Sequence, residues 1–411
     1  MDNVRMFDSR RMQIVLTFGF LAVLISAIAI VRGTAPYPEA STIAHNVQDF
    51  KELSDRFATL AEIKGGEYAF HVLGIAEVPS GTDLHLLGHI VGDELYKQRG
   101  IDGVAVCTQD FRNACSHSVV VGALNEFGPG EATQQKIREA CKRAPGGPGA
   151  YTMCYHGLGH GVFAYYGYDL SKTIVFCERA GTSQYQNEEV AQCISGAVME
   201  LLSGGAHNRE QWLIARKKYL LPEKPLELCM SPLVPDVAKT LCLSYLTPRL
   251  FELAGAEIGN PDPSTFEKAF SFCEPIREKK WRDACYGGFG KEFIPLAASR
   301  DIRSIDQMSD EAYSRAAGWC MHTSITGARS ACIRQALQSV FWGGENDPAA
   351  SLRFCGLVDQ SVAPACYDEL SQATARYLSR DARGNLCQIF PQQYQETCTS
   401  ATSSVFQKNP K

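Results

Sequence analysis

The segment SFCEPIREKKWRDACYGGFGKEFI (residues 271–294) places two cysteines, Cys273 and Cys285, between two apolar runs of helical periodicity. The first cysteine closes the run STFEKAFSFC, in which Ser264 and Glu267 have the spacing of a capping box at a helix start. The second cysteine opens the run CYGGFGKEFI. This segment therefore predicts a helix, a short connector between two cysteines, and a second helix.

The same arrangement recurs along the chain of 411 residues, whose 16 cysteines fall in sequential pairs. FRNAC ends at Cys115 and ARSAC at Cys332, as WRDAC ends at Cys285, and the second cysteines of the pairs recur every 32 to 49 residues. SDEAYSRAAGWC begins with Ser309 as an expected cap, and DPAASLRFC has Pro348 where a first helical turn tolerates proline. A period in this range predicts an all-α array of helical hairpins, either an α-solenoid or an α/α toroid.

The cysteine spacing also predicts the crosslinks. The sequence contains no CxxC, so zinc ribbons, thioredoxin motifs and covalent haem attachment have no support. A disulfide that closes a loop of about 12 residues contributes roughly 3 kcal/mol in the chain-entropy description. We expect one disulfide in the connector of each hairpin, joining nearest neighbours: Cys107–Cys115, Cys141–Cys154, Cys177–Cys193, Cys229–Cys242, Cys273–Cys285, Cys320–Cys332, Cys355–Cys366 and Cys387–Cys398.

Residues 13–31, QIVLTFGFLAVLISAIAIV, form an uncharged apolar stretch near the N-terminus. As a helix rising about 1.5 Å per residue, this stretch just spans a hydrocarbon core of roughly 30 Å. Arg5, Arg10 and Arg11 precede it, which predicts a cytoplasmic N-terminus and a body on the periplasmic or extracellular side. A cleaved signal peptide is the alternative, but the run is long for one and no clean cleavage site follows, so we favour a signal-anchor. Disulfides agree with this topology, because that side of the membrane is oxidising.

These features divide the chain into five parts. The expected parts are a cytoplasmic segment (1–12), a transmembrane signal-anchor (13–31), a linker with a leading helix (32–68), histidine-bearing repeat units (69–205) and cysteine-paired scaffold units (206–411). The net charge of −5, without a basic stripe, excludes nucleic acid as an expected partner. The expected partners are the membrane, through the N-terminal helix, and a protein, peptide or glycan ligand on the repeat surface.

Histidines recur at matching offsets in three consecutive units. Five of the nine histidines fall within residues 85–160, and the segments HLLGHIVG and HGLGHGVF superpose His, Gly and His. Counted from the second cysteine, or from the Asp83 that stands in its place, they occupy the second and sixth positions: His85 and His89, His117, and His156 and His160. The later units keep the cysteines without these histidines, so we interpret the histidines as a site added to a repeated scaffold.

Histidines four residues apart share one face of a helix, and two imidazoles in this relation can reach one ion at about 2.0 to 2.1 Å. We therefore predict a transition-metal site of zinc, copper or iron with all five histidines as ligands. The pattern is not the HExxH of a metalloprotease, because Gly157 and Gly159 stand where its glutamate would be. Non-covalent haem, with the glycines leaving room for a porphyrin, is a competing interpretation. A buried hydrogen-bond network and a pH-sensitive or substrate-binding cluster are further alternatives.

Glu200, seven residues after Cys193, is a weak candidate for a catalytic acid, a base or a carboxylate ligand, and an exposed helix-surface position is its alternative. Ser195 stands where earlier units carry histidine. The predicted function is a metal-dependent oxidoreductase or hydrolase. Two alternatives stay open, which are a helical-repeat binding module with structural histidines and a metal or haem carrier without catalysis.

Overall fold

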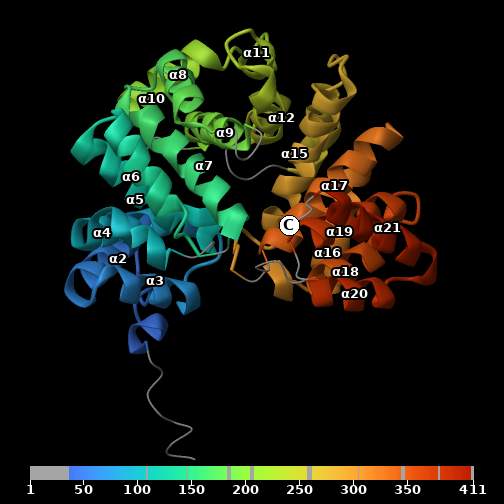
Figure 1. Cartoon of the computed structure of the whole chain (residues 1–411), viewed down its shortest axis with the longest axis horizontal. Coiled ribbons are helices and arrows are strands. Elements are labelled where there is room, and N and C mark those ends of the chain that lie inside the picture. The colour runs from blue at the N-terminus through green and yellow to red at the C-terminus, as the bar shows by residue number, and fades with distance from the viewer. Residues whose placement is uncertain are drawn as a thin grey trace, which may run out of the picture.

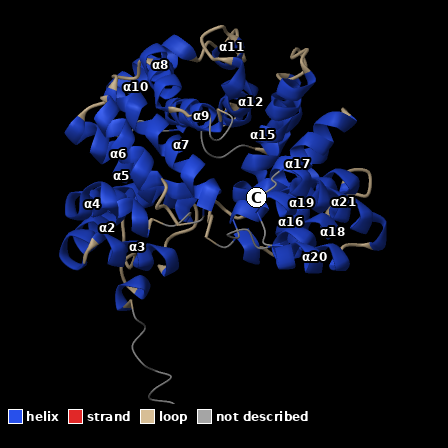
Figure 2. Ribbon diagram, viewed as in Figure 1, coloured by secondary structure: helices blue, strands red, loops and turns tan. Residues whose placement is uncertain are grey.

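The computed structural model describes residues 37–107, 110–145, 147–182, 187–203, 208–256, 262–303, 305–343, 348–377 and 380–408. These residues form α-helices and short 3-10 helices, with no strand among them (Figure 2). The predicted all-α class is thereby confirmed. The expected transmembrane segment, residues 13–31, lies outside the described part of the chain. Within the described part, no helix has both the length and the apolar character that crossing a membrane requires.

Among the residues that the structure describes, four helices precede the first cysteine unit: η1 (Pro38–Ser41), α2 (Phe50–Lys64), α3 (Gly66–Ile75) and α4 (Leu84–Arg99). Asp83, which replaces the cysteine of later units, caps α4 by accepting a hydrogen bond from the backbone N–H of Leu86 at 2.9 Å. A cap satisfies one of the N–H groups that have no partner within the helix. Asp83 thus starts the first histidine-bearing helix without a crosslink.

The cysteine units alternate between two sets of helices. The first cysteine of each pair lies in or just after one of the first-cysteine helices: η2 (Gly100–Val106), α6 (Glu131–Cys141), α8 (Leu170–Ala180), α11 (Glu227–Met230), α14 (Phe266–Ser271), α16 (Asp310–Trp319) with η5 (Cys320–His322), α18 (Pro348–Leu357) and α20 (Arg380–Ile389). The second cysteine lies in one of the second-cysteine helices: α5 (Asp110–Phe127), α7 (Gly147–Tyr165), α9 (Glu188–Ser203), α12 (Asp236–Tyr245), α15 (Lys279–Ala297), α17 (Thr326–Gly343), α19 (Ala363–Tyr377) and α21 (Gln392–Lys408). The remaining elements are connectors: α10 (Arg209–Tyr219), α13 (Thr247–Ala254), η3 (Pro263–Thr265) and η4 (Ile305–Gln307).

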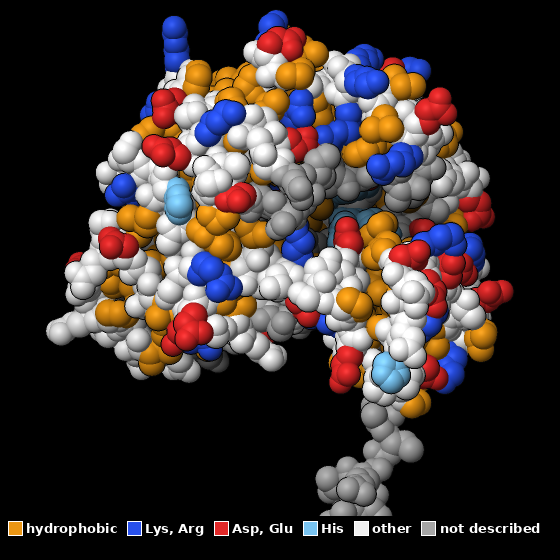
Figure 3. Space-filling view, turned by 180° about the vertical axis from the view of Figure 1, so that it is seen from behind, with side chains coloured by type: hydrophobic (Ala, Val, Ile, Leu, Met, Phe, Trp, Pro, Cys, Tyr) orange, Lys and Arg blue, Asp and Glu red, His pale blue; other side chains and the backbone are white. Residues whose placement is uncertain are grey.

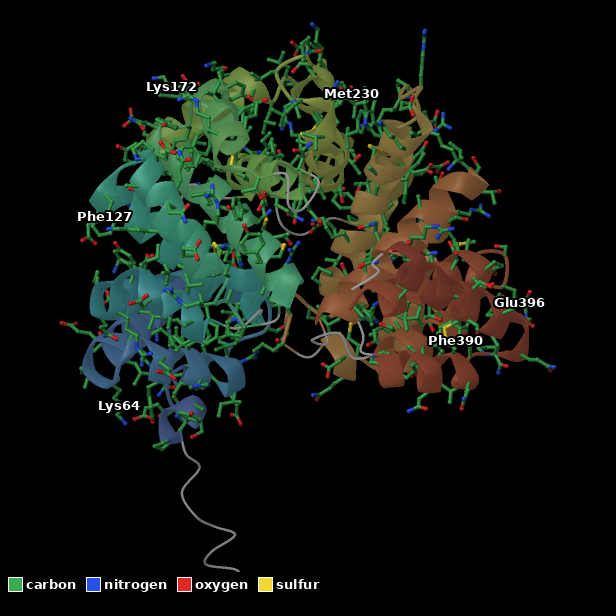
Figure 4. The ribbon with its side chains drawn as sticks, viewed as in Figure 1. Lys64, Phe127, Lys172, Met230, Phe390 and Glu396 are labelled. Carbon is green, nitrogen blue, oxygen red and sulfur yellow. A yellow bond between two sulfur atoms is a disulfide. The ribbon has the colours of Figure 1, made fainter. Side chains whose placement is uncertain are left out.

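The structure joins the same eight cysteine pairs that the spacing predicts. Yellow bonds between neighbouring helices in Figure 4 mark disulfides. Each disulfide therefore fixes a first-cysteine helix against the second-cysteine helix of the same unit.

α4 and the successive second-cysteine helices pack directly on one another, in the order α4, α5, α7, α9, α12, α15, α17, α19 and α21. The array bends into an arc that runs from α2 and α3 through α8 and α11 to α19 and α21 (Figure 1). Equivalent positions on successive helices consequently face each other along the whole array.

A hydrogen-bonded contact joins the end of α3 to the segment after α15. Arg303, after α15, donates hydrogen bonds to the backbone carbonyls of Leu73 at 3.1 Å and Ala76 at 2.6 Å, at the end of α3. Asp301 holds the same guanidinium at 2.8 Å. The arc is therefore bridged between residues that lie more than 200 positions apart in the sequence.

Two of the three predicted helix starts agree with the structure. Ser309 caps α16 by accepting from the N–H of Ala312 at 3.2 Å, and Pro348 is the first residue of α18. The capping box at Ser264 is wrong. Asp262 is the cap instead, accepting from the N–H of Ser264 at 2.8 Å, because Pro263 begins a 3-10 turn ahead of α14.

Glycines let the second-cysteine helices approach closely. A side chain at Gly159 on α7 would overlap the carbonyl oxygen of Cys193 on α9, and one at Gly196 would overlap the carbonyl oxygen of His156. The same contact recurs further along, where Gly290 on α15 faces the carbonyl of Cys332 on α17. This close approach brings the histidine-bearing face of α7 within reach of α9.

Candidate metal centre

The first histidine pair lies on α4, one helical turn apart. His85 donates its Nδ1 hydrogen to the backbone carbonyl of Phe111 at 2.6 Å. His89 Nδ1 lies 3.1 Å from the hydroxyl oxygen of Ser118, which gives its own hydrogen to the carbonyl of His89 at 2.8 Å and so accepts from the imidazole. Both Nδ1 atoms therefore carry the hydrogen, and each Nε2 presents a lone pair.

The second pair lies on α7 and is held in the same way by α9. His156 Nδ1 lies 3.0 Å from the hydroxyl of Ser195, whose hydrogen goes to the carbonyl of Gln192 at 2.8 Å. His160 Nδ1 lies 3.1 Å from a carboxylate oxygen of Glu200. The donor nitrogen is again Nδ1 in both rings, so the two Nε2 atoms again present lone pairs.

The Nε2 atoms of each pair face one another at short range, 3.2 Å apart between His85 and His89 and 3.3 Å apart between His156 and His160. Because each of these four imidazoles has its hydrogen on Nδ1, no hydrogen lies between the two Nε2 atoms of either pair. The two facing lone pairs then repel each other. Two nitrogens at 2.0 to 2.1 Å from one tetrahedral ion lie about 3.3 to 3.4 Å apart. Both separations thus match a pair of ligands on a shared cation.

His117, on α5, lies between the two pairs. Its side chain is fully buried, and neither ring nitrogen has a hydrogen-bond partner. Burial, and then the neighbouring histidines, holds the pKa of His117 well below its ordinary value of 6.5. The ring is therefore neutral, which is the form that binds metal.

All five predicted histidines meet in one cluster. The ring centre of His117 lies 5.6 Å from those of both His85 and His89, 5.5 Å from His156 and 5.1 Å from His160. Burial and the neighbouring His160 also lower the pKa of His156. Nitrogens of His85, His89 and His117 lie within 4.8 Å of one another, so this group of three could hold a metal ion. His85 and His89 are half-buried, and Figure 3 shows histidine side chains inside the hollow at the middle of the back face.

The structure places Glu200 inside the site and not on the helix surface, with 5% of the residue exposed. Its carboxylate fixes the orientation of His160, as carboxylates commonly do for histidines that bind metals. Glu292, at the same offset in α15, pairs with Lys291 instead. Glu200 is therefore a positioning residue, because its contact is to the far side of the ring.

Sequence reasoning missed two side chains of the cluster, Ser118 and Met199, and it missed the role of Ser195. The sulfur of Met199 lies 3.4 Å from Nε2 of His156. Ser195 and Met199 stand two and six residues after Cys193, the offsets that carry histidine in α7. The repeated offsets therefore indicate both positions, provided that residue types other than histidine are considered as ligands or partners.

The glycines around the second pair are filled by neighbouring helices. A side chain at Gly157 would overlap the ring of His117, and one at Gly161 would come within 2.6 Å of a methyl group of Val121. Gly159 is closed by α9 in the same manner. The room that the haem interpretation assigns to a porphyrin at these glycines is thus occupied by α5 and α9.

His71, outside this cluster, is exposed and stacks on Tyr37 with a ring separation of 5.5 Å.

Comparisons of the chain with protein-family models, with curated proteins and with solved structures found no match. The geometry of the cluster is therefore the basis for a functional proposal.

Proposed function

We propose that the protein is a transition-metal protein in which His85, His89, His117, His156 and His160 bind the metal. One observation carries this proposal. Four imidazoles have their Nδ1 hydrogens engaged by fixed acceptors, and their Nε2 lone pairs face each other at 3.2 and 3.3 Å beside a fifth, unpartnered imidazole. A buried hydrogen-bond network would place a hydrogen in each gap, whereas a cation satisfies all of these lone pairs at once.

The ligand number favours catalysis over carriage. His85, His89 and His117, the group of three that could hold one ion, would leave a fourth position of a tetrahedral ion for water or substrate, as in catalytic metal sites. We favour an oxidoreductase over a hydrolase, because Glu200, a carboxylate that contacts the cluster, is hydrogen-bonded to His160 on the far side of the ring and is therefore poorly placed to act as a base for water. Copper and iron suit both the imidazoles and this chemistry. Metal binding without catalysis would make the protein a metal carrier. A histidine cluster that binds no metal would favour the alternative of a helical-repeat binding module with structural histidines.

The compartment is part of the proposal. Eight disulfides favour an oxidising environment. Together with the apolar stretch at residues 13–31, they favour a body on the periplasmic or extracellular side, held at the membrane by one N-terminal helix.

Metal analysis tests the proposal directly. The full chain is produced in an oxidising compartment, purified in mild detergent and assayed for bound elements and by absorption spectroscopy. We expect at least one equivalent of a transition metal and no Soret band. The double substitution His156→Ala/His160→Ala lowers the metal content, while His71→Ala, a change at an exposed histidine, leaves it unchanged. Less than about a tenth of an equivalent of metal in the unaltered protein contradicts the proposal.

A further inference from the structure

The second histidine pair has a soft ligand beside it. Met199, on α9, places its sulfur 3.4 Å from Nε2 of His156, and that Nε2 lies 3.3 Å from Nε2 of His160. A nitrogen at about 2.0 Å and a sulfur at about 2.3 Å from one tetrahedral ion are separated by roughly 3.5 Å. Both contacts at His156 therefore have the length of an edge in one coordination shell.

A hydrogen bond does not account for the contact with sulfur. The hydrogen of His156 is on Nδ1, which faces the hydroxyl of Ser195. Nε2 and the thioether sulfur then meet as two acceptors, and sulfur is a weak acceptor even for a good donor. The lone pairs of two imidazoles and one thioether converge at the same place.

We propose that His156, His160 and Met199 form a second metal site that selects copper(I), distinct from the all-nitrogen group of His85, His89 and His117. Thioethers are soft ligands that favour copper(I), whereas three imidazoles also accept zinc, iron or copper(II). This inference rests on the proposed function and refines it, because the cluster then holds two metal ions of unequal chemistry.

The surroundings of the second site support a defined position for its metal. Ser195 and Glu200 fix the two imidazoles from α9, the helix that also carries Met199. Beyond the site, the ring of Tyr245 packs 5.1 Å from the ring of His156, and the ammonium of Lys291 lies 4.4 Å over the Tyr245 ring. Three ligands and two orienting groups thus come from only two helices, which the glycine contacts between α7 and α9 hold together.

The test compares Met199→Leu with Met308→Leu in the full chain. Leucine removes the sulfur at nearly constant volume, and Met308 is a buried methionine in the second half of the array. Each protein is titrated anaerobically with copper(I) against a chromophoric copper(I) chelator, with ascorbate as the reductant so that the disulfides are kept. Copper X-ray absorption then reports sulfur in the coordination shell.

We expect two copper(I) ions per chain with sulfur scattering in the unaltered protein and in Met308→Leu. In Met199→Leu we expect the sulfur signal to be lost and one of the two ions to bind at least about tenfold more weakly. The variant His85→Ala/His89→Ala keeps one ion and the sulfur signal. Copper bound without sulfur scattering, or equal affinities in both leucine variants, overturns the second site but not the metal cluster. Absence of any bound metal overturns the proposed function itself.

Discussion

Glu200 provides the sharpest test of how the scaffold prepares the histidines. The substitution Glu200→Gln keeps the shape of the side chain and an acceptor oxygen near Nδ1 of His160, but it removes the negative charge. Outer partners of metal-binding histidines commonly contribute 10-fold to 100-fold in metal affinity, about 1.4 to 2.7 kcal/mol. The observed separation of 3.1 Å is longer than the 2.7 to 2.9 Å usual for a charge-assisted hydrogen bond, so we expect a loss near tenfold.

The measurement is metal affinity by chelator competition, with Glu189→Gln as the matched control. Glu189 lies on the same helix, is also buried, and accepts a hydrogen bond from Tyr151 at 2.7 Å. It stands 11 residues before Glu200, which is about 16 Å along the helix. Both substitutions are expected to lower the stability of α9, but only Glu200→Gln weakens metal binding. An affinity within about twofold of the unaltered protein would refute the positioning role.

Three further predictions concern the scaffold and its protonation. Gly159→Ala is expected to destabilise the protein by about 1 to 3 kcal/mol, because the new methyl group meets the carbonyl of Cys193. Gly318→Ala, in open space on α16, is expected to stabilise the protein by roughly 0.5 to 1 kcal/mol. Denaturant unfolding compares the two variants, and a change of stability in the same direction for both would contradict the packing argument. The metal-free protein is expected to lose up to about 1.4 kcal/mol of stability per pH unit for each ring as the pH falls below 6.5, because the unfolded chain then binds protons that the buried His117 and His156, with their lowered pKa values, do not bind. Urea unfolding at several pH values measures this slope. The slope should be smaller in His117→Leu, and an unchanged slope would mean that the His117 ring titrates normally. Arg303→Ala removes the hydrogen bonds to Leu73 and Ala76, so amide hydrogen exchange near the end of α3 is expected to accelerate, while exchange in α19 is unaffected. Unchanged exchange at the end of α3 would show that the bridge does not stabilise the arc.

The hairpins could be predicted because each disulfide joins two cysteines that lie close together in the sequence, so the crosslinks appear as a regular spacing of cysteines. The histidine cluster was predictable in its members for a related reason, since equal offsets in consecutive units place side chains on facing surfaces of stacked helices. The capping error at Ser264 arose from a competing local signal, in which Asp262 and Pro263 start the turn earlier.

Other features depend on contacts that no periodicity records. The bridge from Arg303 to Leu73 joins distant parts of the chain, so no local pattern contains it. The glycines of α7 were equally consistent with a cofactor and with close helix packing until the atoms opposite them were known. Gly157 faces the ring of His117, and Gly159 faces a backbone carbonyl, and both are properties of the packed helices alone.

The later units contain an internal comparison that strengthens the interpretation of the cluster. At the second position after the second cysteine they carry Arg334 on α17 and Asp368 on α19, whose charged atoms lie 2.5 Å apart. Gln338, at the sixth position, donates to Glu369 at 2.6 Å. On α17 and α19, residues at or next to these offsets are thus complementary partners. In the first half of the array the same offsets produce facing lone pairs on imidazoles whose hydrogens are already used, together with the buried and unpartnered His117. Because the scaffold supplies complementary pairs at these positions, the fold alone does not account for the histidine arrangement, and a bound cation is the partner that we propose for it.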